Sequence, residues 1–432
     1  MLETFRNAWK IEDLRKKLIF TFLVLVVYRL GCNIPVPFVD PNVLKLMVGT
    51  TTAGMGAWFN MISGGAFSQA TLFALGVIPY INASIIITLL TVAIPYLENL
   101  SKQGEEGRKQ IAKITRYVAV GISTVLALGY YFILKRIGAI LYTDGMVGFF
   151  VAVVIIIGFV AGTLFLMWMG EQIDKKGIGN GVSLIIFTGI ISRFGNTART
   201  FYVYFLEAMN GTNKLNFVLV PLYIIFAIAV VAFSVVLNNA ERRIPIQYAK
   251  SVSGRKMMGG QSTHLPIKVN MSGVMPIIFA SSLVSIPGTI RRFFTIESEI
   301  VNRIIDVFDV NGFVYSVIYV VLIVLFNYFY VSMQYNPMEI ANNLRKNNGT
   351  IPGYRPGKAT QDYITKVLGN ITFIGAVFLA VVAILPIITG NLTGQDIQMG
   401  GTSVLIIVGV ALEVSQRLEA QMVSRHYSGF LR

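Results

Sequence analysis

The residues that could support acid–base, nucleophilic or phosphate chemistry are few, and they avoid the long apolar runs of this sequence. Arg29 lies near the end of the first run and Glu413 near the end of the last, while His264 and His426 fall outside the runs. A proton-coupled transporter would place an acid or a histidine near the membrane midplane, and an intramembrane protease would need a buried nucleophile with a base. The glycine-rich stretch 177–181 follows no strand, so it indicates a flexible entry to the next run rather than a phosphate loop. The sequence therefore predicts no catalytic residue, no metal site and no cofactor.

The apolar runs instead carry isoleucines at helical spacing. Ile81 and Ile85 are four residues apart, as are Ile186 and Ile190, so each pair lies on one face of a helix. Such isoleucines most often face lipid or pack against a neighbouring helix, and spacing alone does not separate these roles from a pore lining. The serines and asparagines beside them more often join helices than bind ligands.

Composition indicates which elements position these residues. The chain has 432 residues, of which 54% are hydrophobic and 13% charged, and its mean hydropathy is +0.66. Its single cysteine, Cys32, excludes an intramolecular disulfide. Apolar runs long enough to cross a bilayer, roughly 17–25 residues each, recur along the chain. We expect an all-α multi-pass membrane protein with ten transmembrane helices, at 18–34, 72–97, 117–137, 148–170, 178–192, 217–237, 274–290, 313–335, 367–388 and 402–415.

Basic residues orient these helices in the membrane. With a cytoplasmic N-terminus, the inner segments carry 26 of the 36 lysines and arginines, the outer segments carry 9, and Arg29 lies inside the first span. This asymmetry follows the positive-inside rule and predicts that both termini are cytoplasmic. Two long cytoplasmic loops, 238–273 and 336–366, are basic and rich in glycine and proline. They indicate either docking surfaces for a large anionic partner or ordinary solvated loops.

The ten spans divide into two sets of five. The N-terminal half, 1–192, and the C-terminal half, 217–432, lie on either side of an outer connection, 193–216. An odd number of spans in each half inserts the halves in opposite orientations, which is typical of an inverted repeat with a central pathway.

The stretch 54–97 has an unusual division. Its first apolar piece, 57–67, is too short to cross a bilayer, and Gly64-Gly65 separates it from a run that is long enough. Non-helical backbone at membrane depth is stable only against protein or in a water-filled cavity. This division predicts a re-entrant half-helix, with an interfacial helix as the alternative.

Six stretches, in the same order over nearly the whole chain, carry a resemblance to a known family. They are ALGVIPYINASIIITLL (74–90), GEEGRKQIAKITRY (104–117), GIGNGVSLIIFTGI (177–190), KVNMSGVMPIIFASS (268–282), GYRPGKAT (353–360) and GGTSVLI (400–406). Together they resemble SecY, whose members form the channel of the bacterial protein-translocation machinery. Phe38 departs from the glycine that is usual in the family, at an outer turn.

The resemblance implies two five-helix halves that open like a clamshell around an hourglass pore. The constriction ring of the family comes from the second, fifth, seventh and tenth spans. A narrow apolar ring holds water poorly, so it resists ions at rest. On the matching positions of this sequence, the ring falls on Ile81, Ile85, Ile186, Ile190, Ile278 and Ile406.

The resemblance also implies a plug and a lateral exit. The half-helix 57–67 matches the plug, with the glycines at 54, 56, 64 and 65 as hinges. The plug residues are Trp58, Phe59, Asn60, Met61, Ile62, Ser63, Gly64, Gly65 and Phe67. The lateral gate lies where the second and third spans face the seventh and eighth, and its candidate residues are Ile86, Ile87, Ser281, Ser282 and Asn327.

The partners follow from the same resemblance. SecE-like and SecG-like small membrane subunits are implied as stable partners, with signal peptides and nascent polypeptides as substrates and membrane lipid at the lateral exit. The basic loops would dock the SecA motor ATPase and the ribosome, whose RNA phosphates attract cations. The candidate contacts are Arg242, Arg243, Arg255, Lys256, Arg345, Lys346, Arg355 and Lys358. Arg355 matches a functionally critical arginine of the family.

These features predict a protein-conducting channel of the bacterial plasma (inner) membrane and not an enzyme. It would translocate unfolded secretory polypeptides and release signal sequences and transmembrane segments sideways into lipid. The alternative is an inverted-repeat secondary transporter for a small solute, against which the lack of midplane charge counts.

Overall fold

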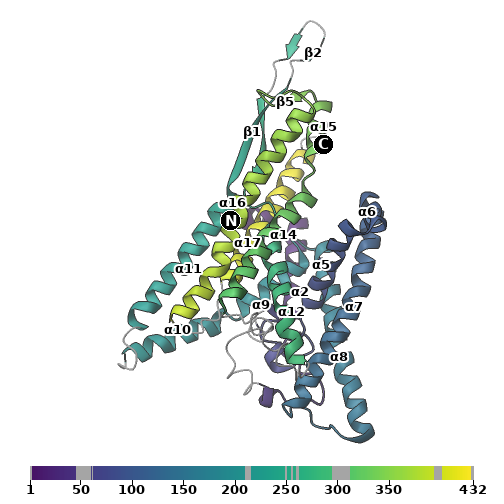
Figure 1. Cartoon of the computed structure of the whole chain (residues 1–432), viewed down its shortest axis with the longest axis vertical. Coiled ribbons are helices and arrows are strands. Elements are labelled where there is room, and N and C mark those ends of the chain that lie inside the picture. The colour runs from purple at the N-terminus through teal and green to yellow at the C-terminus, as the bar shows by residue number, and fades with distance from the viewer. Residues whose placement is uncertain are drawn as a thin grey trace.

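The chain forms a bundle of long helices from which a small β-structure projects at one end (Figure 1). The computed structural model describes residues 2–44, 60, 62–209, 216–248, 251–253, 256–258, 262–293, 312–393 and 401–429. The elements of the N-terminal half are α1 (Leu2–Lys10), α2 (Glu12–Gly31), the 3-10 turn η1 (Phe67–Gln69), α5 (Ile78–Ala93), α6 (Pro95–Lys102), α7 (Glu105–Arg136), α8 (Gly145–Lys176) and α9 (Gly181–Ser192). The helices that follow are α10 (Phe194–Met209), α11 (Asn216–Asn239), α12 (Met275–Phe293), α14 (Phe313–Gln334), α15 (Pro337–Lys346), α16 (Lys358–Thr393) and α17 (Gly401–Gly429).

A helix overlaps each of the ten predicted spans. Within the described part of the chain, five helical segments are long and apolar enough to cross a membrane, and the bent pair α5–α6 forms a sixth candidate. The 12 residues of α9 are fewer than the roughly 20 that a complete crossing needs. The expected class, a helical multi-pass membrane protein, is confirmed.

The second predicted span, 72–97, was too long at both ends. Its helix α5 begins only at Ile78, and it ends at Ala93 before a bend of 99° into α6. Pro95 explains the bend, because the residue before a proline is disfavoured in helical geometry and Ile94 has extended φ and ψ angles of −108° and 114°. Pro95 is visible in the sequence, but the run 72–97 is mostly apolar to its end, so hydropathy alone did not show that the helix ends there.

Several helices are longer than predicted, because hydropathy marks only the apolar part of a helix. α7 begins at Glu105 rather than at residue 117, and α16 begins at Lys358 rather than at 367. In α7 the first turn carries two acids, Glu105 and Glu106, which are favourable at the positive end of the helix dipole. Polar helical turns therefore extend such spans beyond their apolar cores.

The two basic loops pair with each other in a sheet that the sequence analysis did not predict. β1 (Glu241–Tyr248) pairs antiparallel with β4 (Ser262–Lys268) and with β5 (Gly349–Thr350). β2 (Ser251–Ser253) and β3 (Lys256–Met258) form a separate two-stranded ribbon. Figure 1 shows β1 and β5 near α15 at the upper end of the molecule, with β2 projecting beyond them.

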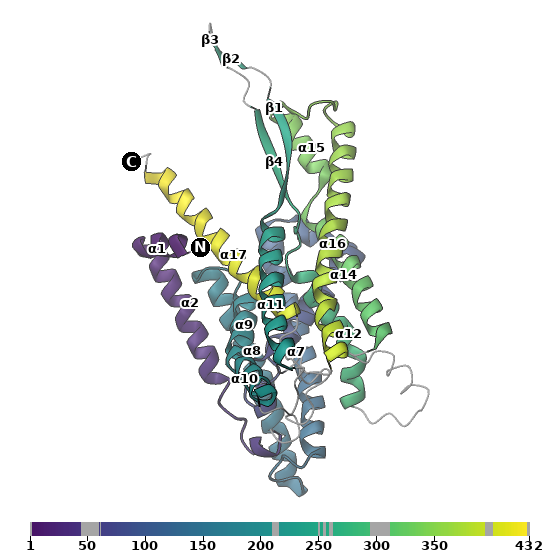
Figure 2. The same ribbon diagram turned by 90° about the vertical axis from the view of Figure 1, so that its left-hand side faces the viewer.

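Packing joins the two halves of the chain. α12 packs against α5 and α7, and α17 packs against α9. Figure 2 shows α1 and α2 on one side of the bundle and α12, α14 and α16 on the other, with α11 and the start of α17 between them. One apolar cluster draws side chains from α2, α5, α8, α9, α11, α12, α14, α16 and α17. The main core of the protein is therefore shared between both halves.

Candidate functional site

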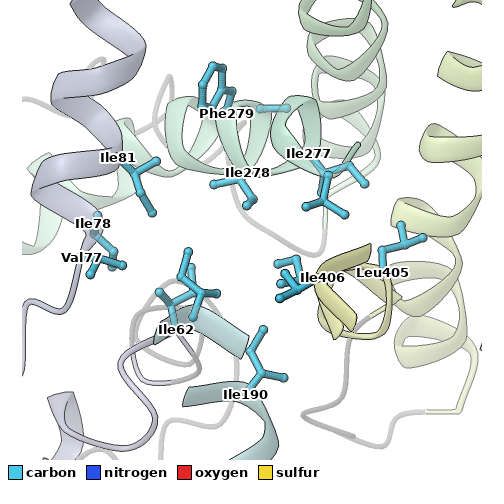
Figure 3. Close-up of a cluster of buried hydrophobic side chains, with 14 of the residues drawn as sticks. Ile62, Val77, Ile78, Ile81, Ile190, Ile277, Ile278, Phe279, Leu405 and Ile406 are labelled. Atoms are coloured by element: carbon cyan, nitrogen blue, oxygen red, sulfur yellow. The ribbon is translucent and has the colours of Figure 1, made fainter. Parts of the chain in front are cut away.

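The six predicted ring isoleucines all lie in the apolar cluster that joins the halves. Each is at most 6% exposed, and they come from α5, α9, α12 and α17. Figure 3 shows Ile81, Ile190, Ile278 and Ile406 directed toward a common space from four different helices. The helical spacing of each pair explains how one helix places two isoleucines on the same face.

Three further residues line this space without having been predicted as part of the ring. Ile62, which was predicted as a plug residue, lies among the ring isoleucines and is 3% exposed (Figure 3). Val77 and Ile78 at the start of α5 belong to the same cluster. Ile78 could have been found from the sequence, because it precedes Ile81 by three residues and continues the same helical face.

The start of α9, which positions Ile186 and Ile190, is braced by side chains. Asn180 caps the helix by accepting a hydrogen bond from Ser183 N at 3.1 Å, and Asp174 accepts one from Gly181 N at 2.8 Å. Arg417 of α17 donates to the carbonyl oxygen of Gly179 at 3.0 Å, which joins the two halves at this point. The stretch 177–181, predicted to be a flexible entry, is thus a turn held by several hydrogen bonds.

The described part of the predicted plug, Asn60 and residues 62–67, folds back on itself. Gly64 and Gly65 have φ angles of 65° and 93°, which only glycine adopts without strain, so the predicted break lies at these residues. Asn60 stabilises the turn, because its carbonyl accepts from Gly65 N at 2.8 Å and its side chain accepts from Ser68 N at 3.1 Å. Trp58, Phe59 and Met61, together with the glycines at 54 and 56, lie outside the described residues.

The predicted gate residues do not share one environment. Ile87 is buried at 4% exposure, whereas its neighbour Ile86 is 42% exposed, because successive helical residues point in different directions. Ser281 and Ser282 are buried on α12, the helix that packs against α5 and α7. The Ser281 hydroxyl bonds to its own helix at the carbonyl of Ile278, and the Ser282 hydroxyl has no hydrogen-bond partner.

Asn327 belongs to a polar network inside the C-terminal half. Its side-chain oxygen accepts a hydrogen bond from Ser272, and its side-chain nitrogen donates to the carbonyl oxygen of Thr372 at 2.8 Å. These bonds join α14 to α16 and to the segment before α12. The hydrogen bonds of Asn327 thus connect parts of the C-terminal half, and neither of them reaches the predicted gate residues Ile86 and Ile87 of α5.

The basic loop residues lie on the projecting β-structure and around it. Ile244 and Ile246 alternate toward a small apolar core with Leu344 and Ile364, which fixes the sheet on α15 and α16. The described side chains of Arg242, Arg243, Arg345, Lys346, Arg355 and Lys358 are exposed. Arg243 also forms an ion pair with Glu241 at 2.7 Å. Arg255 lies outside the described residues, and Lys256 is described only as part of β3.

Arg355 is presented by a well-fixed turn. Tyr354 stacks on Tyr363 of α16 with ring centroids 4.2 Å apart, and Thr360 donates to the carbonyl oxygen of Arg355 at 2.9 Å. The backbone on either side of Arg355 is therefore held while its side chain is exposed. This arrangement suits a cation that must meet a partner in one orientation.

A separate cavity of about 530 Å³ lies between α10, α11, α16 and α17. Its wall is formed by apolar side chains such as Phe194, Phe201, Phe226 and Val404. Such a wall fits hydrocarbon rather than a charged solute. Among the described residues, no three histidine, cysteine, aspartate or glutamate side chains gather as a metal site.

These features define a multi-pass α-helical membrane protein with an apolar core shared between two halves. The sequence profile of the SecY family matches residues 71–415. The chain is 42% identical to protein translocase subunit SecY of Bacillus licheniformis over 436 residues, which covers all of both chains. It is 42% identical to the same subunit of Thermotoga maritima over 438 residues, covering all of this chain and 98% of the relative. The chain therefore belongs to the SecY family.

Solved structures share the fold. A protein-conducting channel has a TM-score of 0.60 at 21% identity, with 95% of this chain and 93% of that chain covered. A SecY structure, described as having a plug domain that stabilises the closed state and maintains a membrane seal, has a TM-score of 0.63 at 21% identity with the same coverage. Canine Sec61 in a ribosome–channel complex has a TM-score of 0.58 at 20% identity and the same coverage. At these identities, the comparisons show a common architecture.

Proposed function

We propose that this chain forms the channel through which a bacterial translocase moves unfolded secretory polypeptides across the plasma membrane. Both termini would be cytoplasmic, as the distribution of lysine and arginine predicts. The observation that carries the proposal is the convergence of isoleucines from α5, α9, α12 and α17 in one buried cluster between the halves. Membership of the SecY family supports the same function.

The ring isoleucines seal the channel at rest because an apolar constriction dewets. Water and hydrated ions gain no hydrogen bonds from isoleucine side chains, so the constriction opposes ion flow. The same side chains give a passing polypeptide no charge or polar group to bind to. The ring thus blocks ions at rest and still lets a polypeptide pass when it widens.

The segment from Asn60 to Phe67 blocks the channel beside the ring. Ile62 packs among the ring isoleucines, and the turn at Gly64 and Gly65 lies within the blocking segment. A turn that depends on glycine can change direction at lower cost than a continuous helix. Displacement of this segment and widening of the ring would together open the path.

The lateral gate is the contact between α12 and the pair α5 and α7. Ile87 of α5 and the small polar residues Ser281 and Ser282 of α12 are buried on these helices. A contact made by small side chains separates at less cost than a large interdigitated apolar one. Signal sequences and transmembrane segments would leave through this opening into lipid.

The projecting sheet and the loop around Arg355 form the cytoplasmic docking surface. Its exposed arginines and lysines would bind the SecA motor ATPase during export and ribosomal RNA phosphates during cotranslational insertion. SecE-like and SecG-like subunits would complete the membrane complex. The energy for transport then comes from these partners or from the membrane potential.

Site-specific photocrosslinking tests the proposal. A photoreactive residue at Ile278 should capture a stalled secretory polypeptide in reconstituted vesicles, because this position is buried in the central cluster. The same residue at Phe149 of α8, which is 75% exposed on the apolar surface, is the matched control and should capture lipid instead. Equal polypeptide capture at both positions, or none at Ile278, would contradict the proposed path.

A further inference from the structure

We infer that the last turn of α2 positions the blocking segment through a latch formed by Tyr28, Arg29 and Cys32. The inference rests on the proposed role of Asn60–Phe67 as a movable seal. It assigns a task to Arg29 and Cys32, two residues for which neither the ring, the gate nor the docking loops account.

The three latch side chains converge on two consecutive carbonyl oxygens. The Tyr28 hydroxyl and the Cys32 thiol both donate to Ser63 O, at 3.4 Å and 3.8 Å. Arg29 donates through Nη1 to Gly64 O at 3.1 Å. Tyr28 and Cys32 are four residues apart and therefore share a helix face, while Arg29 reaches the next carbonyl along the segment.

The charge of Arg29 makes the latch more than ordinary packing. An arginine inside a membrane span is costly and is usually paired or directed toward a polar region. Here its guanidinium meets the backbone of the blocking segment, and charged donors form stronger hydrogen bonds than neutral ones. When the segment leaves, Arg29 loses this acceptor, so the resting position is favoured.

The backbone at Gly64 of the segment packs closely between Arg29 and Gly189 of α9. A Cβ atom added at Gly64 would lie 2.8 Å from Arg29 Nη1 and 2.9 Å from Gly189 Cα. Gly189 precedes the ring residue Ile190 on α9, so the segment lies between the latch and a ring helix. Only glycine at both positions allows this approach, and the latch therefore couples the segment to the ring.

Alkylation of Cys32 provides a direct test, because it is the only cysteine of the chain and is 2% exposed. Its thiol lies 3.8 Å from Ser63 O, so displacement of the segment should expose it and raise the labelling rate. In the complete reconstituted complex, Arg29→Gln should raise the rate of N-ethylmaleimide labelling about tenfold, and Arg29→Lys should restore part of the protection. Arg15→Gln, which removes an exposed arginine of the same helix, is the control and should leave the rate unchanged.

Tyr28→Phe, which removes a single hydroxyl, gives an independent variant if Arg29→Gln fails to accumulate. Parental labelling rates in both variants would overturn the latch. Resting ion conductance is measured on the same preparations. Faster labelling with greater conductance supports both the latch and the seal. Faster labelling with unchanged conductance retains the latch and contradicts the proposed sealing role of the segment.

Discussion

The Tyr130 hydroxyl donates a hydrogen bond to the carbonyl oxygen of Phe67 at 2.6 Å, and the two rings stack with centroids 4.7 Å apart. Tyr130 belongs to α7, and Phe67 begins η1 at the end of the blocking segment. This pair therefore fixes the end of the segment that lies beyond the glycine turn, while the latch on α2 fixes the turn itself.

Replacing Tyr130 by phenylalanine should keep the stacked ring and remove the hydrogen bond. The Phe67 carbonyl would keep only its hydrogen bond from Ala70 N, so the loss should be that of one hydrogen bond, about 0.5–1.5 kcal/mol in the free energy of unfolding. Denaturant-induced unfolding in detergent micelles measures the loss. Tyr117→Phe on the exposed part of the same helix is the control, and an equal loss there would contradict the assignment.

Gly189→Ala should disturb the contact between α9 and the blocking segment. The added Cβ would lie 2.7 Å from Ile62 O, and overpacking of this kind costs about 1–3 kcal/mol. Faster labelling of Cys32 and a lower free energy of unfolding are the expected results. Gly195→Ala is the matched control, because nothing lies within 4 Å of its Cβ position. Identical behaviour of the two variants would mean that the close approach is unimportant.

Binding of the ribosome should depend on salt and on Arg355. Each lysine or arginine that contacts a phosphate contributes about one unit to the dependence of log affinity on log salt. Arg355→Ala should weaken binding and reduce this slope by about one unit, as measured by cosedimentation over a salt series. Arg136→Ala, at the predicted outer end of α7, should change neither quantity. Binding that does not respond to salt would exclude phosphate contacts.

Opening between α5 and α12 should require Ile87 to leave its buried position. A cysteine at Ile87, tested in turn against single cysteines at positions 281–285 of α12, should form a crosslink that stops translocation. Ile86→Cys is the comparison, because Ile86 is 42% exposed whereas Ile87 is 4% exposed. Continued transport through a fully crosslinked Ile87 variant would contradict a lateral gate at this place.

Hydropathy and helical spacing anticipated the elements that carry the site. Each apolar span overlaps a helix, and the four-residue separation of Ile81 from Ile85 and of Ile186 from Ile190 placed each pair on one helix face. Their convergence could not be derived from spacing, because a lipid-facing isoleucine has the same local pattern. Only the resemblance to a family directed attention to a central ring.

Long-range contacts explain what the sequence analysis missed. β1 and β4 pair within one loop, but the third strand depends on the pairing of Gln247 with Thr350, residues that belong to different loops. The bonds from Tyr28 and Arg29 to the blocking segment also join distant parts of the chain. Arg29 was noticed as a charge in a span, but its acceptor is a backbone carbonyl that no side-chain pattern identifies.

The resting ion conductance of ring variants tests the central claim most directly. The triple variant Ile81→Ser, Ile190→Ser and Ile278→Ser places hydroxyl groups in the central cluster, so its complex in planar bilayers should conduct several-fold more than the parent. The matched control replaces the exposed Ile157, Ile225 and Ile374 by serine and should conduct like the parent. Unchanged conductance in the ring variant, or an equal rise in both variants, would contradict an isoleucine seal.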